Sequence, residues 1–230
     1  EQDRQGLLAQ DPRAHVHVVE NGTDSEYLAP VYGNEEPDTL VFAGNLRWYP
    51  NVSGLEFFVD QVWPLLKPQR PNLRLCLAGR EAEDSFLRWA RRDPSITVVP
   101  DPVDIRPFVD RGWVFICPIL DGGGTRLKIL DALAMGKAVV STTIGCEGLR
   151  VTPDENILVA DHPHEFAAAV LRVLESADLR RRLGAAGRAF VEQQYDWRVI
   201  SDQLRRAYTC ALAPGSCSHL APASLKGEGR

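Results

Sequence analysis

Three consecutive glycines, Gly122 to Gly124, lie between a continuous apolar run, Trp113 to Ile119, and a segment of helical periodicity, Thr125 to Met135. The apolar run has the length and β-branched character of a buried parallel strand. A strand that passes through glycines into a helix N-terminus can bind phosphate. Its free N–H groups and the positive end of the helix dipole face the anion, and glycine lets the backbone come close. The chemistry that this pattern indicates is phosphate binding.

Two cations and one carboxylate accompany the glycines. Arg126 and Lys128 fall in the first turn of the predicted helix, where the helix dipole disfavours positive charge. An anionic partner such as a diphosphate would compensate that charge. Asp131, about a turn and a half further on, is a lone carboxylate among apolar residues. The alternative is that both cations are merely solvated and that Asp131 lies on an exposed face; the spacing alone leaves both interpretations open.

Alternating strands and helices must position these residues. The predicted strands are Thr39 to Gly44, Leu73 to Gly79, Ile96 to Val99, Trp113 to Ile119, Ala138 to Ser141 and Ile157 to Ala160. The predicted helices are one after Pro50 and those over Glu83 to Arg92, Asp104 to Asp110, Thr125 to Met135, Glu165 to Ser176, Leu179 to Gln194 and Trp197 to Leu212. This alternation predicts an α/β fold, a Rossmann-like doubly wound parallel sheet with helices on both faces. The glycines at strand ends would then converge on one crevice at the carboxyl edge.

The segment GTRLKILDALAMGKAVVSTTIGCEGL resembles the donor-nucleotide motif of the group 1 glycosyltransferases, a large retaining family with the two-domain GT-B architecture. The resemblance extends over residues 15–212 and is strongest over 113–149. It implies that the chain is the C-terminal, donor-binding half of such an enzyme. Asp131 would hold the nucleotide ribose, Lys128 with Arg126 would stabilise the departing diphosphate, and the loop from Gly122 to Thr125 would face the phosphates.

Two positions depart from the usual motif of that family. Asp131 stands where most members have a Glu, so its side chain is one methylene shorter. Many members also carry a Glu eight residues earlier, and that position is Gly123 here. The second change removes a side-chain contact to the donor sugar. It leaves open which sugar is used and whether full activity is retained.

The loops after the first two strands add further candidates. Gly44 would form a tight turn, and the following residues resemble a subgroup of the family with Trp48 and then Pro50-Asn51. Arg47 is a candidate for phosphate binding, the alternative being a surface arginine beside a packed tryptophan. Arg80, after the second strand, is equally open to phosphate contact or to simple exposure.

The remaining candidates follow the third and fifth strands. The loop around Val103 corresponds to the family's loop at the nucleobase, where backbone groups would pair with the base edge. Side chains there therefore do not identify the base. Thr142 and Thr143 would add hydroxyl and N–H donors to the phosphates, or would cap the turn after their strand.

The N-terminal region resembles the family's inter-domain crossing. Residues 15–37 begin with a short alternating pattern typical of a strand and turn at Asn21-Gly22. Residues 1–14 would belong to the edge of a first domain that the chain lacks, and the first residue, Glu1, indicates a piece of a longer protein. The small, polar, Pro- and Gly-rich tail is typical of a disordered end.

We therefore expect four regions. Residues 1–38 would be the inter-domain segment and the remnant of the N-terminal domain, and residues 39–195 the Rossmann-like nucleotide-sugar-binding domain. Residues 196–213 would form a C-terminal crossover helix, and residues 214–230 a disordered tail.

Composition excludes several other functions. A hydrophobic content of 44% is ordinary for a globular protein, and a net charge of −5 argues against a general nucleic-acid surface. No apolar run approaches the length of a membrane span. The five cysteines show no CxxC spacing, and Cys76 and Cys117 lie in apolar runs, as buried thiols do. This pattern favours a reduced, cytoplasmic setting.

Other site chemistries find little support. No histidine has a Cys or carboxylate partner at metal-ligand spacing, so no metal site is expected. No Gly-x-Ser-x-Gly elbow occurs. A nicotinamide fingerprint would follow the first strand, whereas these glycines follow the fourth.

The resemblance implies transfer of a hexose from a UDP-, GDP- or ADP-sugar to an acceptor hydroxyl, with no cofactor and no metal required. The partners would be that nucleotide-sugar and the missing N-terminal domain, through which peripheral membrane contact is also open. The isolated chain would bind donor without transferring sugar. Two rivals are a nucleotide-sugar epimerase of the same architecture and a non-catalytic nucleotide-sugar-binding module. The base, the sugar, the acceptor and the oligomeric state stay open.

Overall fold

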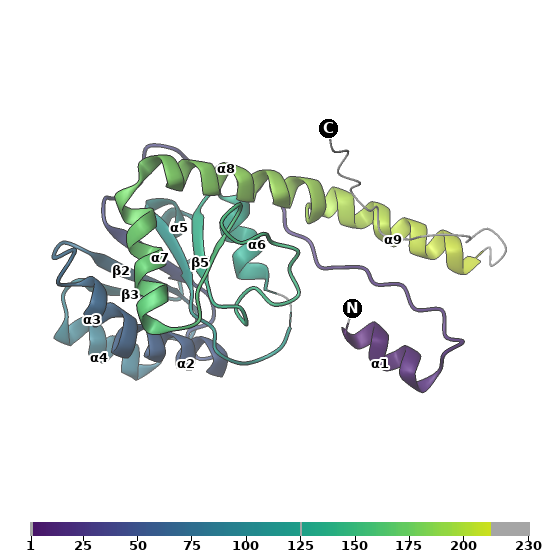
Figure 1. Cartoon of the computed structure of the whole chain (residues 1–230), viewed down its shortest axis with the longest axis horizontal. Coiled ribbons are helices and arrows are strands. Elements are labelled where there is room, and N and C mark those ends of the chain that lie inside the picture. Colours follow the sequence, from purple (N-terminus) through teal and green to yellow (C-terminus); the bar gives the residue numbers. More distant parts are fainter. Residues whose placement is uncertain (1, 125, 213–230) are drawn as a thin grey trace. The chain divides into compact units, whose positions relative to one another are not determined.

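The computed structural model describes residues 2–124 and 126–212 (Figure 1). The chain divides into a larger compact unit, Asn21–Trp197, and a smaller unit drawn from residues 1–20 and 198–230. The smaller unit contains helix α1 (Gln2–Gln10) and nearly all of helix α9 (Trp197–Leu212). The site candidate Thr125 and the tail predicted over 214–230 lie outside the described residues.

The larger unit is built on one parallel sheet, which confirms the predicted fold class (Figure 1). The order of the described strands is β3-β2-β1-β4-β5-β6, and every neighbouring pair is parallel. Their bounds are β1 Thr39–Ala43, β2 Arg74–Gly79, β3 Ile96–Pro100, β4 Val114–Cys117, β5 Ala138–Ser141 and β6 Leu158–Val159. The order reverses between β1 and β4, so the carboxyl ends of these two strands flank the switch point at which such sheets bind ligands.

Both faces of the sheet are buried because successive side chains of a strand point to opposite sides. Leu40 and Phe42 of β1 belong to one core cluster, together with apolar residues of helices α2, α3, α4 and α7. Val41, between them, belongs to the other cluster, with residues of helices α5, α6 and α8. The continuous apolar character of the strands follows from this two-sided burial.

The helices of the larger unit connect successive strands. Their bounds are α2 Tyr49–Phe57, α3 Trp63–Leu66, α4 Asp84–Arg92, α5 Arg106–Arg111, α6 Leu127–Ala134, α7 Pro163–Glu175 and α8 Ala177–Gln194. A π-helical segment, Phe58–Val62, joins α2 to α3. Pro64 lies just beyond this segment and has no N–H to donate to the carbonyl of Asp60, which explains why the regular hydrogen-bond pattern changes there.

The elements lie where the sequence predicted them from residue 39 onward, with ends moved by a few residues. The helix after the glycines begins at Leu127, because Arg126 has the non-helical φ and ψ of an N-cap residue. The predicted strand 113–119 is limited to Val114–Cys117, the part that pairs with β1 and β5. The prediction of a short strand after residue 15 was wrong. Residues 15–20 carry no strand assignment, because no described segment pairs with them.

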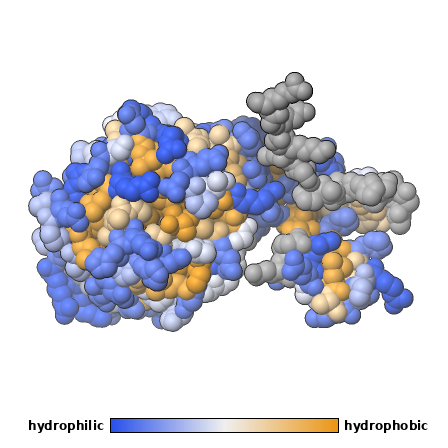
Figure 2. Space-filling model, viewed as in Figure 1, coloured by the Kyte–Doolittle hydropathy of each residue, from blue (hydrophilic) through white to orange (hydrophobic). Residues whose placement is uncertain are grey.

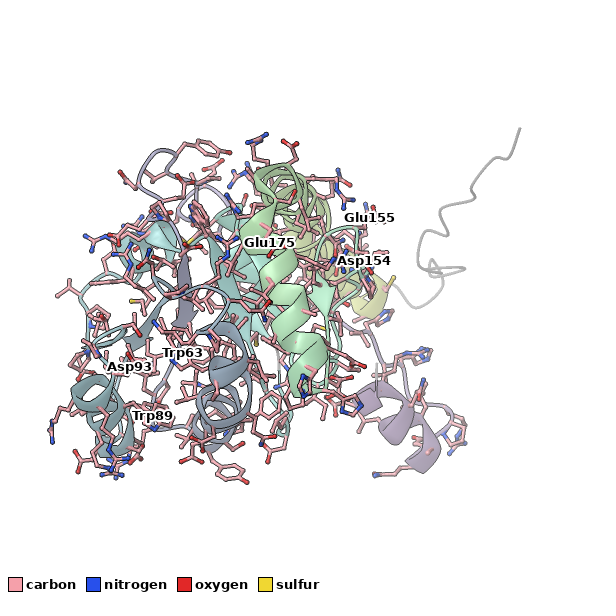
Figure 3. All side chains as sticks on the ribbon, turned by 60° about the vertical axis from the view of Figure 1, so that its left-hand side comes forward. Trp63, Trp89, Asp93, Asp154, Glu155 and Glu175 are labelled. Carbon is pink, nitrogen blue, oxygen red and sulfur yellow. The ribbon has the colours of Figure 1, made fainter. Side chains whose placement is uncertain are left out.

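Helices α3 and α4 are tied together beside the sheet by a tryptophan and an aspartate (Figure 3). The Trp63 indole N–H donates to the Asp93 carboxylate over 3.0 Å, and Ser95 also donates to Asp93. Trp89 packs against Phe86 with ring centroids 4.8 Å apart. Burial raises the pKa of Asp93, but the hydrogen bonds from Ser95 and Trp63 outweigh it, so this pKa lies below its ordinary value.

Three cysteines of the larger unit are free thiols. Cys117 is fully buried and Cys76 is half-buried, and burial raises the pKa of Cys76 to about 11. These thiols are structural, as expected. Cys210 of α9, by contrast, is disulfide-bonded.

The surface of the larger unit carries separate hydrophobic patches between hydrophilic residues (Figure 2). None of the described helices is both long enough and apolar enough to cross a membrane.

Candidate functional site

The loops that follow β1 and β2 meet at the carboxyl edge of the sheet. A Cβ built on Gly79 would lie 1.6 Å from the carbonyl oxygen of Gly44, so the two loops touch through their backbones. The Leu46 N–H also donates to the Arg80 carbonyl over 2.7 Å. Gly44 and Gly79 therefore hold these loops together, and no larger residue fits at Gly79.

The glycine-rich loop after β4 also requires its glycines. Gly122 and Gly124 have φ angles of +89° and +99°, which side-chain-bearing residues rarely adopt. A Cβ on Gly122 would lie 2.7 Å from Pro50 Cγ, so this loop packs on the start of α2. A Cβ on Gly123 would meet nothing within 4 Å. The side chain of the N-cap residue, Arg126, makes no capping hydrogen bond to α6, so among the described residues the first N–H groups of this helix are left for an anion.

The Arg126 side chain stabilises the glycine-rich loop after β4. This side chain is 4% exposed, which is incompatible with a merely solvated surface cation. The guanidinium donates to the Gly122 carbonyl over 2.6 Å and lies 3.7 Å from Glu147, while its Nε is buried with no hydrogen-bond partner in the described structure. Arg126 therefore holds the glycine loop in shape and adds positive charge beneath it.

Lys128, in the first turn of α6, is enclosed by residues of β1 and of the start of α2. Its ammonium donates to Asn51 Oδ1 and lies 4.8 Å from the centroid of the Phe42 ring and 5.7 Å from that of Trp48. Asn51 is itself fixed, since it is 1% exposed and its Nδ2 donates to the Asn45 carbonyl over 2.6 Å. The position of the Lys128 ammonium is therefore set by the loop after β1.

Burial lowers the pKa of Lys128, and the nearby charge of Arg126 lowers it further. An ammonium that has lost part of its hydration and faces a second cation gains most from an anionic partner. Since this ammonium lies at an uncapped helix N-terminus beside a glycine loop, the anion that the geometry favours is a phosphate group.

Asp131 lies on the next turn of α6 and is partly buried. Its Oδ1 accepts a hydrogen bond of 2.6 Å from the hydroxyl of Thr23. Burial raises the pKa of Asp131, and the Thr23 hydroxyl opposes that rise. The carboxylate is therefore not on an exposed face, which excludes the simplest alternative for this residue.

Two of the predicted cationic candidates are exposed. Arg47 lies in the loop after β1, and its guanidinium is 3.8 Å from Glu83. Arg80 follows β2 at the same edge, and its side chain has no polar partner within the described residues. Trp48 is exposed to 45%, so the packed tryptophan expected beside Arg47 is only partly buried. Phosphate binding by either arginine stays a prediction.

The other candidates lie in loops at the same edge. Val103 is fully exposed in the loop after β3, so its side chain is free of contacts. The Thr142 hydroxyl is buried, donates to the Ile119 carbonyl and accepts from the Gly145 N–H over 2.8 Å. Thr143 bonds to Asp161 through its N–H and its hydroxyl, each over 2.7 Å. Both threonines thus make hydrogen bonds within their loops, and donation to phosphates by either stays a prediction.

The structure brings Lys128 and the glycine loop together at the switch point, with Asp131 one turn further along α6. Sequence reasoning missed three partners. Asn51 was noticed only as part of a Pro-Asn pattern, and Phe42 only as a strand residue. Thr23 carried no signal at all, since 108 residues separate it from Asp131. Within the described ranges no group of His, Cys, Asp and Glu is arranged to hold a metal ion.

A doubly wound parallel sheet with cationic side chains and a glycine-rich loop at its switch point is typical of the class of nucleotide-binding α/β domains. Comparison with known proteins identifies the family within that class. The sequence model of the family described as "Glycosyl transferases group 1" matches residues 37–176. The chain belongs to this family.

Curated relatives and solved structures agree with the assignment. The phosphatidyl-myo-inositol mannosyltransferase of Mycobacterium tuberculosis is 34% identical over 217 residues, which cover 86% of this chain and 55% of that protein. The GDP-mannose-dependent monoacylated alpha-(1-6)-phosphatidylinositol monomannoside mannosyltransferase of Corynebacterium glutamicum is 27% identical, covering 72% of this chain and 46% of that protein. The chain thus spans about half the length of these relatives.

The crystal structure of Anabaena HepE in complex with UDP has the same fold. It superposes with a TM-score of 0.71 at 15% identity, over 91% of this chain and 62% of that one.

Proposed function

We propose that this chain is the nucleotide-sugar-binding half of a retaining glycosyltransferase that moves a hexose from a nucleoside diphosphate sugar to an acceptor hydroxyl. Family membership and the names of the two mannosyltransferases support a transferase. The name of the Corynebacterium relative gives GDP-mannose as its donor and HepE was crystallised with UDP, so the base of the nucleotide used by this chain is left undetermined.

The observation that carries the proposal is the enclosed ammonium of Lys128. It is held by Asn51 and two aromatic rings beside an uncapped helix N-terminus. In sugar transfer, negative charge builds up on the departing diphosphate. A fixed cation and oriented amides stabilise that charge without having to reorganise during the reaction.

The other residues have separate roles in this proposal. Asp131 accepts hydrogen bonds from the ribose hydroxyls, and backbone groups near Val103 meet the base. Arg126 keeps the glycine loop in shape and adds charge beneath it. These cations and the helix dipole supply the charge that a metal ion supplies elsewhere, so we propose that no metal is required.

The acceptor site and the opposite wall of the cleft belong to an N-terminal domain outside this chain. The complete enzyme would act in the cytoplasm. The isolated chain would then bind donor and transfer nothing, since half a cleft neither orients an acceptor nor excludes water.

A two-part experiment tests the proposal. Isothermal titration calorimetry of the 230-residue chain with UDP, GDP and ADP should show binding of at least one of them. The full-length parent and the isolated chain should then be incubated with the matching nucleotide-sugars, with and without an acceptor mixture. We expect transfer by the parent alone. A new nucleotide-sugar formed without acceptor would instead indicate an epimerase, and binding with no turnover by the parent a non-catalytic module.

A further inference from the structure

Asp131 is shorter by one methylene than the glutamate usual at its position, yet the proposed function requires it to reach a ribose hydroxyl. A buried carboxylate with no donor tends to take up a proton, and a protonated acid accepts hydrogen bonds poorly. The chain has a donor for it. The hydroxyl of Thr23, from a distant part of the sequence, lies 2.6 Å from Asp131 Oδ1.

Thr23 is held firmly by its backbone. Its N–H donates to the Tyr195 carbonyl over 2.8 Å, and its carbonyl accepts from the Trp197 N–H over 3.1 Å. The preceding residue is tightly packed, since a Cβ on Gly22 would lie 2.9 Å from the Trp197 ring. Thr23 is 3% exposed, so its hydroxyl is directed by a rigid frame rather than by solvent.

We propose that Thr23 is a positioning residue for donor binding. It occupies one oxygen of Asp131, fixes the rotation of the carboxylate and leaves the other oxygen for a ribose hydroxyl. The inference rests on the proposed function and names a determinant of ribose recognition within it.

The protonation of Asp131 follows from the same contacts. Burial raises its pKa and Thr23 lowers it. The charged groups of the adjoining elements are engaged elsewhere. Lys128, on the same helix, bonds to Asn51, Asp196 accepts from Ser25, and Arg188 of α8 bonds to the Ala134 carbonyl. Loss of the Thr23 hydroxyl should therefore raise the pKa of Asp131, and the ribose contact should fail at a higher pH.

Thr23→Val tests the inference, with Thr23→Ser as the matched control. The probes are UDP, GDP and ADP, and inorganic pyrophosphate serves as the ligand that has no ribose. With Thr23→Val we expect about tenfold weaker binding of the nucleoside diphosphate, the effect of losing one hydrogen bond to a charged group. Pyrophosphate affinity should stay within about twofold of wild type, the scale of changes at distant sites. Thr23→Ser should restore nucleoside diphosphate binding.

The pH profile separates positioning from a purely structural role. The affinity difference between nucleoside diphosphate and pyrophosphate should fall on the acid side as Asp131 protonates, and in Thr23→Val that fall should move to higher pH. Unchanged affinity and an unchanged profile in Thr23→Val would overturn the inference but not the proposed function. Failure of the wild-type chain to bind any of the three nucleotides would overturn both.

If Thr23→Val does not fold, the Asp131→Asn variant provides the test of the inference. It should lose nucleoside diphosphate affinity at every pH and retain pyrophosphate binding. Wild-type affinity in Asp131→Asn would overturn the inference.

Discussion

Replacing Lys128 by methionine removes the charge while keeping a flexible apolar side chain of similar length between Phe42 and Trp48. In wild type the ammonium donates to Asn51 and is partly withdrawn from water, which lowers its pKa. A charge-assisted hydrogen bond is worth about 1.5–3 kcal/mol, so nucleoside diphosphate binding should weaken roughly 10- to 150-fold. Binding of the free nucleoside should hardly change, because Lys128 is not expected to touch the ribose or the base.

Lys137→Met is the matched control. Lys137 is also a buried lysine with a lowered pKa caused by burial, but its ammonium donates over 2.6 Å to the Asp110 carbonyl. It immediately precedes β5 and so lies at the opposite, amino edge of the sheet. This variant should lower the free energy of unfolding without changing affinity for the diphosphate by more than about twofold.

Isothermal titration calorimetry with the best-binding nucleoside diphosphate and with its nucleoside measures both effects, and thermal unfolding reports the stability of each variant. The phosphate role would be refuted if Lys128→Met weakened nucleoside and nucleoside diphosphate equally. It would also be refuted if Lys137→Met weakened the diphosphate as much as Lys128→Met did.

Three further predictions concern pH and packing. Because the pKa of Lys128 is lowered, nucleoside diphosphate affinity should fall on the alkaline side at a pH below that of an ordinary lysine, and titrations across that range would detect it. Gly79→Ala should destabilise the fold by about 1–3 kcal/mol or more, since its Cβ would strike the backbone, whereas Gly123→Ala should stay within about 0.5 kcal/mol; urea unfolding compares them. Trp63→Phe should cost about 1 kcal/mol at neutral pH. It should also move acid unfolding to higher pH, because the depressed pKa of Asp93 contributes stability that is lost as pH falls through it.

The sheet could be predicted from the sequence because its signals are local. Apolar runs that end on glycine predicted β1 and β2, a continuous apolar run predicted β4, and the alternation with helices predicted parallel pairing. The prediction of a strand after residue 15 was wrong because strand formation there depends on a distant partner and not on local signals. A short alternating pattern becomes a strand only beside a partner, and no described segment pairs with it.

The site could be predicted only in part. Residue types and spacing made Lys128 and Asp131 candidates, and the family resemblance assigned their roles, but the burial of their side chains could not be predicted from spacing. Both Lys128 and Arg126 were predicted to stabilise the diphosphate, and nothing in the sequence indicated that the Arg126 guanidinium donates to the Gly122 carbonyl. Thr23 could not have been found at all, since its contact with Asp131 depends on how the segment after Asn21 packs against the residues around Tyr195.

The positions of the cationic side chains in this site are electrostatically unfavourable, and this cost suggests which kind of ligand the site binds. The only cation in the sequence of the loop after β1, Arg47, is exposed near Glu83. The charge lies on α6 instead, where Arg126 and Lys128 face the unfavourable end of a helix dipole and repel one another.

Burial makes that repulsion stronger, because little water screens the two cations. Lys128 is compensated by neutral groups, the Asn51 amide and the aromatic rings, and Arg126 by the Gly122 carbonyl and the half-exposed Glu147 carboxylate. The packing of the fold therefore holds both cations in position before any anion binds. In the proposed function, a diphosphate bound there would reduce the repulsion between the two cations, and the stabilisation would grow as negative charge increases on the leaving group.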